Sequence, residues 1–334
     1  MADTHPGRTR AADLPKDTLL RMYRDMVEQR RFEESAARSY GMGKIYGFCH
    51  LYIGQEAIST ATAHATEDRD IVVSAYRIHA QALAMGISPD KVMAELMGKA
   101  SGSVHGLGGS MHIYDVEKGF WGGWGLVGQQ IPMATGIAFA QKYRKTGAVT
   151  LGFFGDGALH QGAIHESFNL ASIYDVPIVF VLENNGYGMG TAVSRVSSLE
   201  PIHEMAASYK FEHAVVDGMN VLDCYDAFSD AIEHARSKSR PFFLECRASR
   251  FRGHSMSDPG KYRTKEQLEE EKALDPIPKL GAVLVEKGYA TEDELKQIDK
   301  DIKAEIKDVT KRAEAADWPD PSLIDKYTYV DPLR

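Results

Sequence analysis

Apolar and polar residues along the chain alternate in blocks that predict strands and helices in turn. Continuous apolar runs at Thr150–Phe154 and Val176–Leu182 are typical of buried strands, and His160–Tyr174 between them has apolar residues at helical spacing. Two strands joined by one helix form a β-α-β unit, in which the strands are parallel neighbours. The pattern therefore predicts an α/β fold with a mainly parallel sheet flanked by helices.

The same alternation continues on both sides of this unit. Apolar stripes predict helices over four further segments, Leu14–Tyr40, Val92–Met97, Met133–Tyr143 and Val221–Ser237. Strands are expected over three, Ile71–Ala75, Ala214–Val216 and Pro241–Cys246. From about residue 264 the chain becomes charge-dense with helical spacing, which predicts a helical C-terminal extension. We interpret residues 14–334 as one α/β domain, preceded by a disordered arm over residues 1–13.

Composition excludes several classes of protein. The 334 residues carry a formal net charge of −8, which argues against general nucleic-acid binding. Cys49, Cys224 and Cys246 are far apart in the chain and predict neither a disulfide framework nor a zinc site. No apolar run approaches the ~20 residues of a membrane span. The first residues lack the apolar segment of a secretory signal, so we expect a cytoplasmic protein of bacterial type.

Candidate chemistry follows the two strands of the central unit. Gly155-Asp156-Gly157 ends the first strand, and Asn185 comes just after the second. Ligands of parallel sheets bind at the carboxyl ends of the strands. Carboxylate and amide oxygens suit Mg²⁺, which completes its octahedron with phosphate oxygens and water. Each motif alone could be an ordinary turn, but their matching positions favour a site for a metal-bridged diphosphate.

Three further segments add candidate groups around this edge. Tyr76-Arg77 follow a predicted strand, and a basic loop over Ser249–Arg263 contains Arg250 and His254. Arginine can bind a diphosphate through paired, charge-assisted hydrogen bonds, although a solvated basic surface would look the same. The glycine-rich segment Ser101–Trp124 is typical of a long ordered loop beside a site, and it contributes His105 and His112 as candidates.

These motifs together resemble a known family. Gly155-Asp156-Gly157 followed by Asn184-Asn185 is similar to the signature of thiamine-diphosphate enzymes. From about Leu19 to Thr264 the chain resembles the alpha subunits of 2-oxo acid dehydrogenases, most closely those that decarboxylate pyruvate. Gly109-Ser110-Met111-His112 is similar to the pyruvate-type and acetoin-type subunits. The resemblance implies the diphosphate-binding half of the thiamine-diphosphate fold.

The resemblance also implies roles for individual residues. Asp156, Asn185 and the backbone carbonyl of Tyr187 would bind Mg²⁺. His254, with His105, would transfer protons or position the bound intermediate. Besides the metal ligands, the cofactor-binding set would be His50, Tyr76, Arg77, Gly125, Val127, Gly157, Ala158, Arg250 and His254.

The activity implied is decarboxylation of pyruvate, in which thiamine diphosphate accepts the electron pair as carbon dioxide leaves, and reductive acetylation of a lipoyl group on a partner acyltransferase. A beta subunit would supply the glutamate that activates the cofactor, in an α₂β₂ tetramer. Acetoin and branched-chain 2-oxo acids stay open as alternative substrates. A dinucleotide-dependent oxidoreductase is disfavoured because Gly106-Leu107-Gly108 lacks a preceding strand. A non-catalytic scaffold subunit would be expected to lack Asp156 and Asn185.

Overall fold

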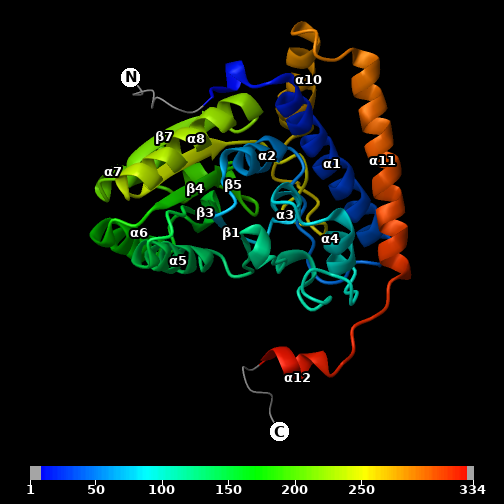
Figure 1. The fold of residues 1–334 in the computed structure, drawn as a ribbon, viewed down its shortest axis with the longest axis horizontal. Coiled ribbons are helices and arrows are strands. Elements are labelled where there is room, and N and C mark those ends of the chain that lie inside the picture. Colours follow the sequence, from blue (N-terminus) through cyan, green and yellow to red (C-terminus); the bar gives the residue numbers. More distant parts are fainter. Residues whose placement is uncertain (1–8, 329–334) are drawn as a thin grey trace.

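A six-stranded parallel sheet forms the centre of the molecule (Figure 1). The structure is a computed structural model that describes residues 9–328. The strands lie in the order β2-β1-β3-β4-β8-β7, and every neighbouring pair is parallel. Their bounds are β1 Ile71–Ser74, β2 Phe120–Gly123, β3 Thr150–Gly155, β4 Ile178–Asn184, β7 Glu212–Asp217 and β8 Phe242–Arg247. The predicted α/β fold with a mainly parallel sheet is confirmed.

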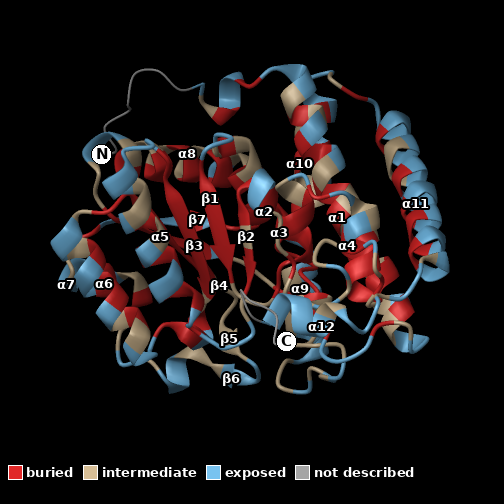
Figure 2. Ribbon diagram, turned by 60° about the horizontal axis from the view of Figure 1, so that its bottom comes forward, coloured by how far each residue is buried: buried red, intermediate tan, exposed pale blue. Residues whose placement is uncertain are grey.

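Helices cover both faces of the sheet, so all of its strands except the edge strand β7 are mostly buried (Figure 2). One face packs against α5 (Gln130–Arg144), α6 (Gly162–Tyr174) and α7 (Met205–Ser208), and the other against α2 (Glu56–Ala65) and α8 (Val221–Lys238). Because side chains alternate along a strand, Phe180 and Leu182 of β4 enter the first layer, while Val179 and Val181 enter the second. This double burial explains the continuous apolar runs in the sequence.

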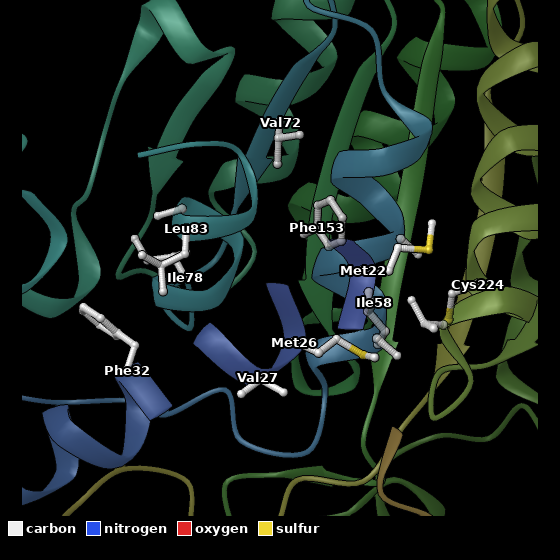
Figure 3. Packing of buried hydrophobic residues seen from close by; sticks show 14 of the residues in the cluster. Met22, Met26, Val27, Phe32, Ile58, Val72, Ile78, Leu83, Phe153 and Cys224 are labelled. Carbon is white, nitrogen blue, oxygen red and sulfur yellow. The ribbon is translucent and has the colours of Figure 1, made fainter. Parts of the chain in front are cut away.

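A block of helices extends the second layer beyond the sheet. It contains α1 (Lys16–Gly41), α3 (His79–Ala84), α4 (Pro89–Leu96), α10 (Pro276–Glu286) and α11 (Glu292–Ala315), and α11 packs along α1 and α4 (Figure 1). Met22 and Ile58 lie with Cys224 and Phe153 in one continuous apolar cluster (Figure 3). The helical C-terminal part predicted from about residue 264 is confirmed, and α9 (Lys265–Lys272) and α12 (Leu323–Thr328) complete it.

Short elements differ from the sequence-based expectations. Strand β2 lies inside the glycine-rich segment expected to be irregular, where two glycines in four residues weaken the strand pattern. It pairs with β1 at the edge of the sheet. Helix α3 spans only six residues, too few to show a period in the sequence. A hairpin of β5 (Tyr187–Gly188) and β6 (Thr191–Ala192) follows β4.

The start of the described chain is ordered against α8. Ala11–Asp13 forms a 3₁₀ helix, the Ala11 N–H donates to Asp226 at 2.9 Å, and Arg10 pairs with Asp230 at 2.9 Å. The prediction of a disordered arm over residues 1–13 is therefore wrong for residues 9–13, because these contacts tie the segment to the domain. Residues 1–8 lie outside the described part of the chain.

Within residues 9–328, no helix is both long enough and apolar enough to cross a bilayer.

Candidate active site

Asp156 and Asn185 lie side by side at the carboxyl edge of the sheet. Asp156 follows β3 and Asn185 follows β4, and these strands are paired in parallel up to Gly155 and Glu183. The Asn185 backbone N–H donates to Asp156 Oδ1 at 3.4 Å. The predicted meeting of these two residues is confirmed, since parallel neighbouring strands end at the same edge.

The Asp156 carboxylate has one oxygen available to a ligand. The residue is 5% exposed, and Oδ2 is buried without a hydrogen-bond partner in the protein. Burial raises the pKa of this carboxyl to about 6, against the opposing effects of backbone N–H groups and Arg250. Asp156 also lines a cavity of about 390 Å³. A buried carboxylate oxygen without a partner is costly, which is consistent with a cation as its missing partner.

Glycine permits the close approach of the hairpin to this turn. A Cβ atom at Gly157 would lie 3.0 Å from Cα of Gly188, and one at Gly188 would lie 3.1 Å from Cα of Gly157. The β5 strand, which begins at Tyr187, therefore contacts the turn that carries Asp156. Tyr187 and Ala158 both line the cavity. A larger residue at either glycine would push the Tyr187 backbone away from Asp156.

Two buried arginines face the same cavity. Arg77 donates to the backbone carbonyls of Leu51 and His254, the latter at 2.8 Å. Desolvation, followed by repulsion from Arg250, lowers the pKa of Arg77 to about 10. Arg250 Nη1 donates to Asn185 Oδ1 at 3.4 Å. Neither arginine pairs with a carboxylate in the described residues, so the cavity is suited to an anionic ligand.

His50, Tyr76 and His254 form an aromatic cluster, of which Tyr76 and His254 line this cavity. The ring centroid of His50 lies 4.6 Å from that of Tyr76 and 5.1 Å from that of His254. Desolvation and then the Arg77 charge lower the pKa of His50 to about 3 and that of His254 to about 4. Both imidazoles are therefore neutral near pH 7, and each has a buried Nδ1 without a protein partner.

A second, wider cavity of about 1000 Å³ opens beside the first. It shares Tyr76, Val127, Met189 and His254 with the smaller cavity and is also lined by Gly125. Several of its side chains are apolar and exposed, namely Phe48, Leu126, Val127 and Met189. His112 lies in its wall, with Nδ1 3.2 Å from the carbonyl oxygen of Gly123. The predicted cofactor-binding residues therefore surround two connected spaces.

His105 lies elsewhere. Its ring stacks on Tyr327 of α12 at a centroid distance of 5.4 Å, and it lines neither of the two cavities described above. The glycine-rich loop turns away at this point, where His105 has a φ of 61°. The structure thus does not bring the predicted pair His254 and His105 together, and we leave His105 out of the site.

A single carboxylate holds the glycine-rich loop in shape. Glu95 of α4 is fully buried and accepts backbone N–H groups of four loop residues at 2.7–3.1 Å, Val104, Gly106, Gly108 and Gly109. These bonds satisfy backbone donors that the irregular loop cannot pair with itself. The loop then runs on to Met111 and His112 at the wide cavity.

Gln55 is a site residue that sequence reasoning missed. Its Oε1 accepts from Asn185 Nδ2 at 3.1 Å, its Nε2 is buried without a protein partner, and it lines the smaller cavity. The neighbouring Gly54 has a φ of 105°, and a Cβ there would lie 2.3 Å from the Ser249 carbonyl oxygen. In the sequence, Gln55 is marked only by its place in Gly54-Gln55-Glu56, at the start of a helix. Nothing in this spacing predicts a contact with Asn185.

The donor set also limits the kind of metal site. Within residues 9–328, no group of three or more His, Cys, Asp or Glu side chains is arranged to hold a metal ion. An ion at Asp156 would therefore need oxygens from an amide, a backbone carbonyl, a phosphate or water. Mg²⁺ bound together with a diphosphate takes ligands of these kinds. The residues present therefore fit a Mg²⁺ ion and a diphosphate.

Comparisons with known proteins show similarity to one family over most of the chain. The family model described as dehydrogenase E1 component matches residues 24–322. A Rhizobium meliloti protein described as pyruvate dehydrogenase E1 component subunit alpha is 46% identical over 324 residues, covering 96% of this chain and 91% of that protein.

Two further relatives carry the same description. The one from Rickettsia bellii is 42% identical over 94% of this chain and 97% of its own length. The one from Zymomonas mobilis is 44% identical over 94% of this chain and 88% of its own length. Both the family model and these relatives extend across the sheet and the helical C-terminal part, and the chain belongs to the dehydrogenase E1 component family.

Proposed function

We propose that the chain is the alpha subunit of a thiamine-diphosphate-dependent enzyme that decarboxylates pyruvate and transfers the acetyl group to a lipoyl group. The observation that carries this is the buried, unpaired Oδ2 of Asp156 in a cavity that also contains Arg77 and Arg250. The descriptions of the relatives support pyruvate as the substrate.

Asp156, Asn185 and the Tyr187 carbonyl would hold Mg²⁺ between the protein and the diphosphate. Arg77 and Arg250 would neutralise the remaining phosphate charge, and Tyr76 would line the same end of the cavity. Gly157 and Ala158 leave room for the phosphates at the turn after β3. Gly125 and Val127 would contact the ring portion, because they line the wider cavity next to the first.

When bound, thiamine diphosphate supplies the electron sink that accepts the electron pair released on loss of carbon dioxide. The chain's own residues orient the reactants and control protons. His254 is neutral and has an unpaired Nδ1, so it can accept a proton or donate a hydrogen bond, depending on its tautomer. His50 beside it has the same character and fixes the position of the Tyr76 and His254 rings.

A beta subunit in an α₂β₂ tetramer is part of the proposal. Helices α5 and α6 expose apolar side chains that a partner would cover, Met133, Phe139, Tyr143, Leu170, Ile173 and Tyr174. Exposed apolar patches of this kind mark protein interfaces. Helix α5 also begins directly after Gly125 and Val127, so a partner on this face lies next to the wider cavity. A lipoyl domain would reach the site through the opening of the wider cavity. A cytoplasmic location stays a prediction.

The substrate is tested on the protein co-expressed with its beta subunit. Dye reduction would be measured with Mg²⁺, thiamine diphosphate and, in parallel, pyruvate, acetoin or 2-oxoisovalerate. We expect the highest kcat/KM with pyruvate. Preference for either other compound would contradict the substrate assignment, and no activity with bound cofactor would favour a non-catalytic scaffold.

Asp156→Asn tests the metal assignment separately from the substrate. Replacing the charged ligand should weaken Mg²⁺-dependent thiamine diphosphate binding by about 100-fold or more, about 3 kcal/mol, as measured by tryptophan fluorescence quenching. Asp70→Asn is the matched control, since Asp70 is equally buried just before β1, at the opposite edge of the sheet. Unchanged cofactor affinity in Asp156→Asn would contradict the metal site.

A further inference from the structure

Behind the proposed metal ligands lies a buried carboxylate that contacts neither cavity. Glu245 of β8 is fully buried. Its Oε1 accepts from Asn184 Nδ2 and from Arg247 Nε, both at 2.9 Å, and its Oε2 lies 3.0 Å from His203 Nδ1. A buried carboxylate is costly unless such partners satisfy it, and these three contacts hold the Glu245 carboxylate in one orientation.

Asn184 connects this carboxylate to the turn that carries Asn185. Its Oδ1 accepts the Gly186 N–H at 3.1 Å, while its Nδ2 is held by Glu245. Gly186 has a φ of 81°, and its carbonyl oxygen accepts the Val193 N–H at 3.1 Å, which closes the β5–β6 hairpin. An asparagine that bonds the backbone two residues on shapes a turn in this way.

We propose that Glu245 is a positioning residue for the metal-binding turn and acts through Asn184. The proposal rests on the function proposed above, in which Asn185 and the Tyr187 carbonyl bind Mg²⁺. Those two ligands stand on either side of Gly186, so the Asn184–Gly186 bond sets their relative orientation. Glu245 fixes the Asn184 amide so that its oxygen, and not its nitrogen, faces the Gly186 N–H.

Groups that orient metal ligands from behind typically change metal affinity by about 10–100-fold when they are removed. Glu245→Gln removes the negative charge that holds Asn184 Nδ2 and Arg247 Nε, and it turns one carboxylate oxygen into an amide nitrogen, which is a donor. Asn184 Nδ2 then faces either this donor or a neutral amide oxygen, which is a weaker acceptor, so its orientation is held less firmly. The sequence gives no sign of this, because Glu245 lies 61 positions from Asn184 and reaches it only through the β4–β8 pairing.

The test measures metal binding directly, on the complex with the beta subunit and with saturating thiamine diphosphate. Mn²⁺ replaces Mg²⁺, and the free ion is counted by its electron paramagnetic resonance signal. We expect the Kd of Mn²⁺ to rise about 10–100-fold in Glu245→Gln. The control Asp70→Asn should stay within about twofold of the unmodified protein, because Asp70 pairs with Arg236 at the far edge of the sheet.

A double-variant cycle separates positioning from general destabilisation. In an Asn184→Ala background, Glu245→Gln should change the Kd by less than about threefold, since its route to the turn is already removed. The proposal would be overturned if the effects of Asn184→Ala and Glu245→Gln on the Kd were fully additive. An unchanged Kd in Glu245→Gln alone would also overturn it. Should Glu245→Gln fail to fold, Asn184→Ala alone must raise the Kd at least about tenfold, and no change there overturns it. Absence of any metal binding in the unmodified protein would instead overturn the proposed function, and the positioning role with it.

Discussion

At the scale of single residues, the site concentrates charges that the protein does not neutralise itself. Asp156 is buried with one unpaired oxygen, and Arg77 and Arg250 are buried with only carbonyl, amide and hydroxyl partners. Charges left in this state cost free energy in the protein without ligand. A diphosphate with its metal ion would supply the missing partners, and its binding would then be coupled to local stability.

Arg77→Met tests how much one of these cations contributes to cofactor affinity. Methionine keeps an unbranched side chain of similar length but removes the charge and the donors. Thiamine diphosphate binding should weaken by roughly 1.5–3 kcal/mol, the range for hydrogen bonds to charged groups. Equilibrium dialysis with Mg²⁺ would measure it.

A control is needed because Arg77 also ties together the Leu51 and His254 backbones. Thermal unfolding of Arg77→Met without cofactor would measure how much these backbone hydrogen bonds contribute to stability. A loss of stability with unchanged cofactor affinity would mean that Arg77 is structural only.

At the scale of elements, helix α1 is held between the sheet-covering layer and α11. It packs against α2, α10 and α11, and its inner face contributes Leu19, Met22 and Met26 to the main apolar cluster. Glu28 lies on the side of α1 near α11, where burial and then the charges of Asp25 and Glu305 raise its pKa to about 7. Ionisation of Glu28 between α1 and α11 therefore lowers the stability of the folded protein.

Glu28→Gln should therefore stabilise the protein in a pH-dependent way. Below the ordinary glutamate pKa of 4.5 the carboxyl is protonated in both the folded and the unfolded state, so its burial does not lower the stability. As pH rises to about 7 the unfolded state ionises first, so the native protein loses stability relative to the variant. Above pH 7 the variant should be more stable by roughly 1–3 kcal/mol.

Urea unfolding at pH 8 and pH 5 would measure the difference, which should shrink towards pH 5. Glu292→Gln, at an exposed position of α11, serves as the control and should show no such trend. Equal stabilisation by Glu28→Gln at both pH values would contradict the role of its ionisation.

At the scale of the whole molecule, the two faces of the sheet have different surroundings. The α1–α11 block extends the layer on one face, and α5 and α6 cover the other (Figure 1). Helices α5 and α6 leave apolar residues exposed. The opening of the wider cavity is lined by exposed Phe48, Leu126 and Met189. An active site shared with a partner subunit would account for both the apolar face and the open cavity.

Ile173→Asp on α6 tests this interpretation. Ile173 is 63% exposed, so the substitution should leave the stability of the single chain nearly unchanged. Association with the beta subunit should weaken by about 2 kcal/mol or more, roughly 30-fold. Analytical ultracentrifugation of the two mixed subunits would measure it.

Val285→Asp on α10 is the matched control, because it also changes an exposed apolar residue but lies away from α5 and α6. Equal weakening by both variants would show that the effect does not come from the α5–α6 face. Unchanged association in Ile173→Asp would place the partner elsewhere.

Local patterns in the sequence were sufficient for the long elements and for the pairing of Asp156 with Asn185. Buried strands have continuous apolar runs and helices have apolar stripes, so β3, α6 and β4 could be predicted from neighbouring residues. Once these strands are parallel neighbours, the residues that follow them must meet. Residue roles such as those of Gly125 and Val127 came instead from resemblance, since backbone contacts leave little trace in side-chain identity.

Only the tertiary structure decided which distant residues join the site. Glu245, Gln55 and His203 approach the turn that carries Asn185 through sheet pairing and loop packing, whereas His105 lies against α12. Burial shifts the pKa values of His50, His254 and Asp156, because desolvation depends on surroundings that no local pattern encodes. The sequence by itself determined the fold and the edge of the sheet where chemistry occurs. Only the structure determined which side chains support the residues at that edge, since these contacts join residues far apart in the sequence.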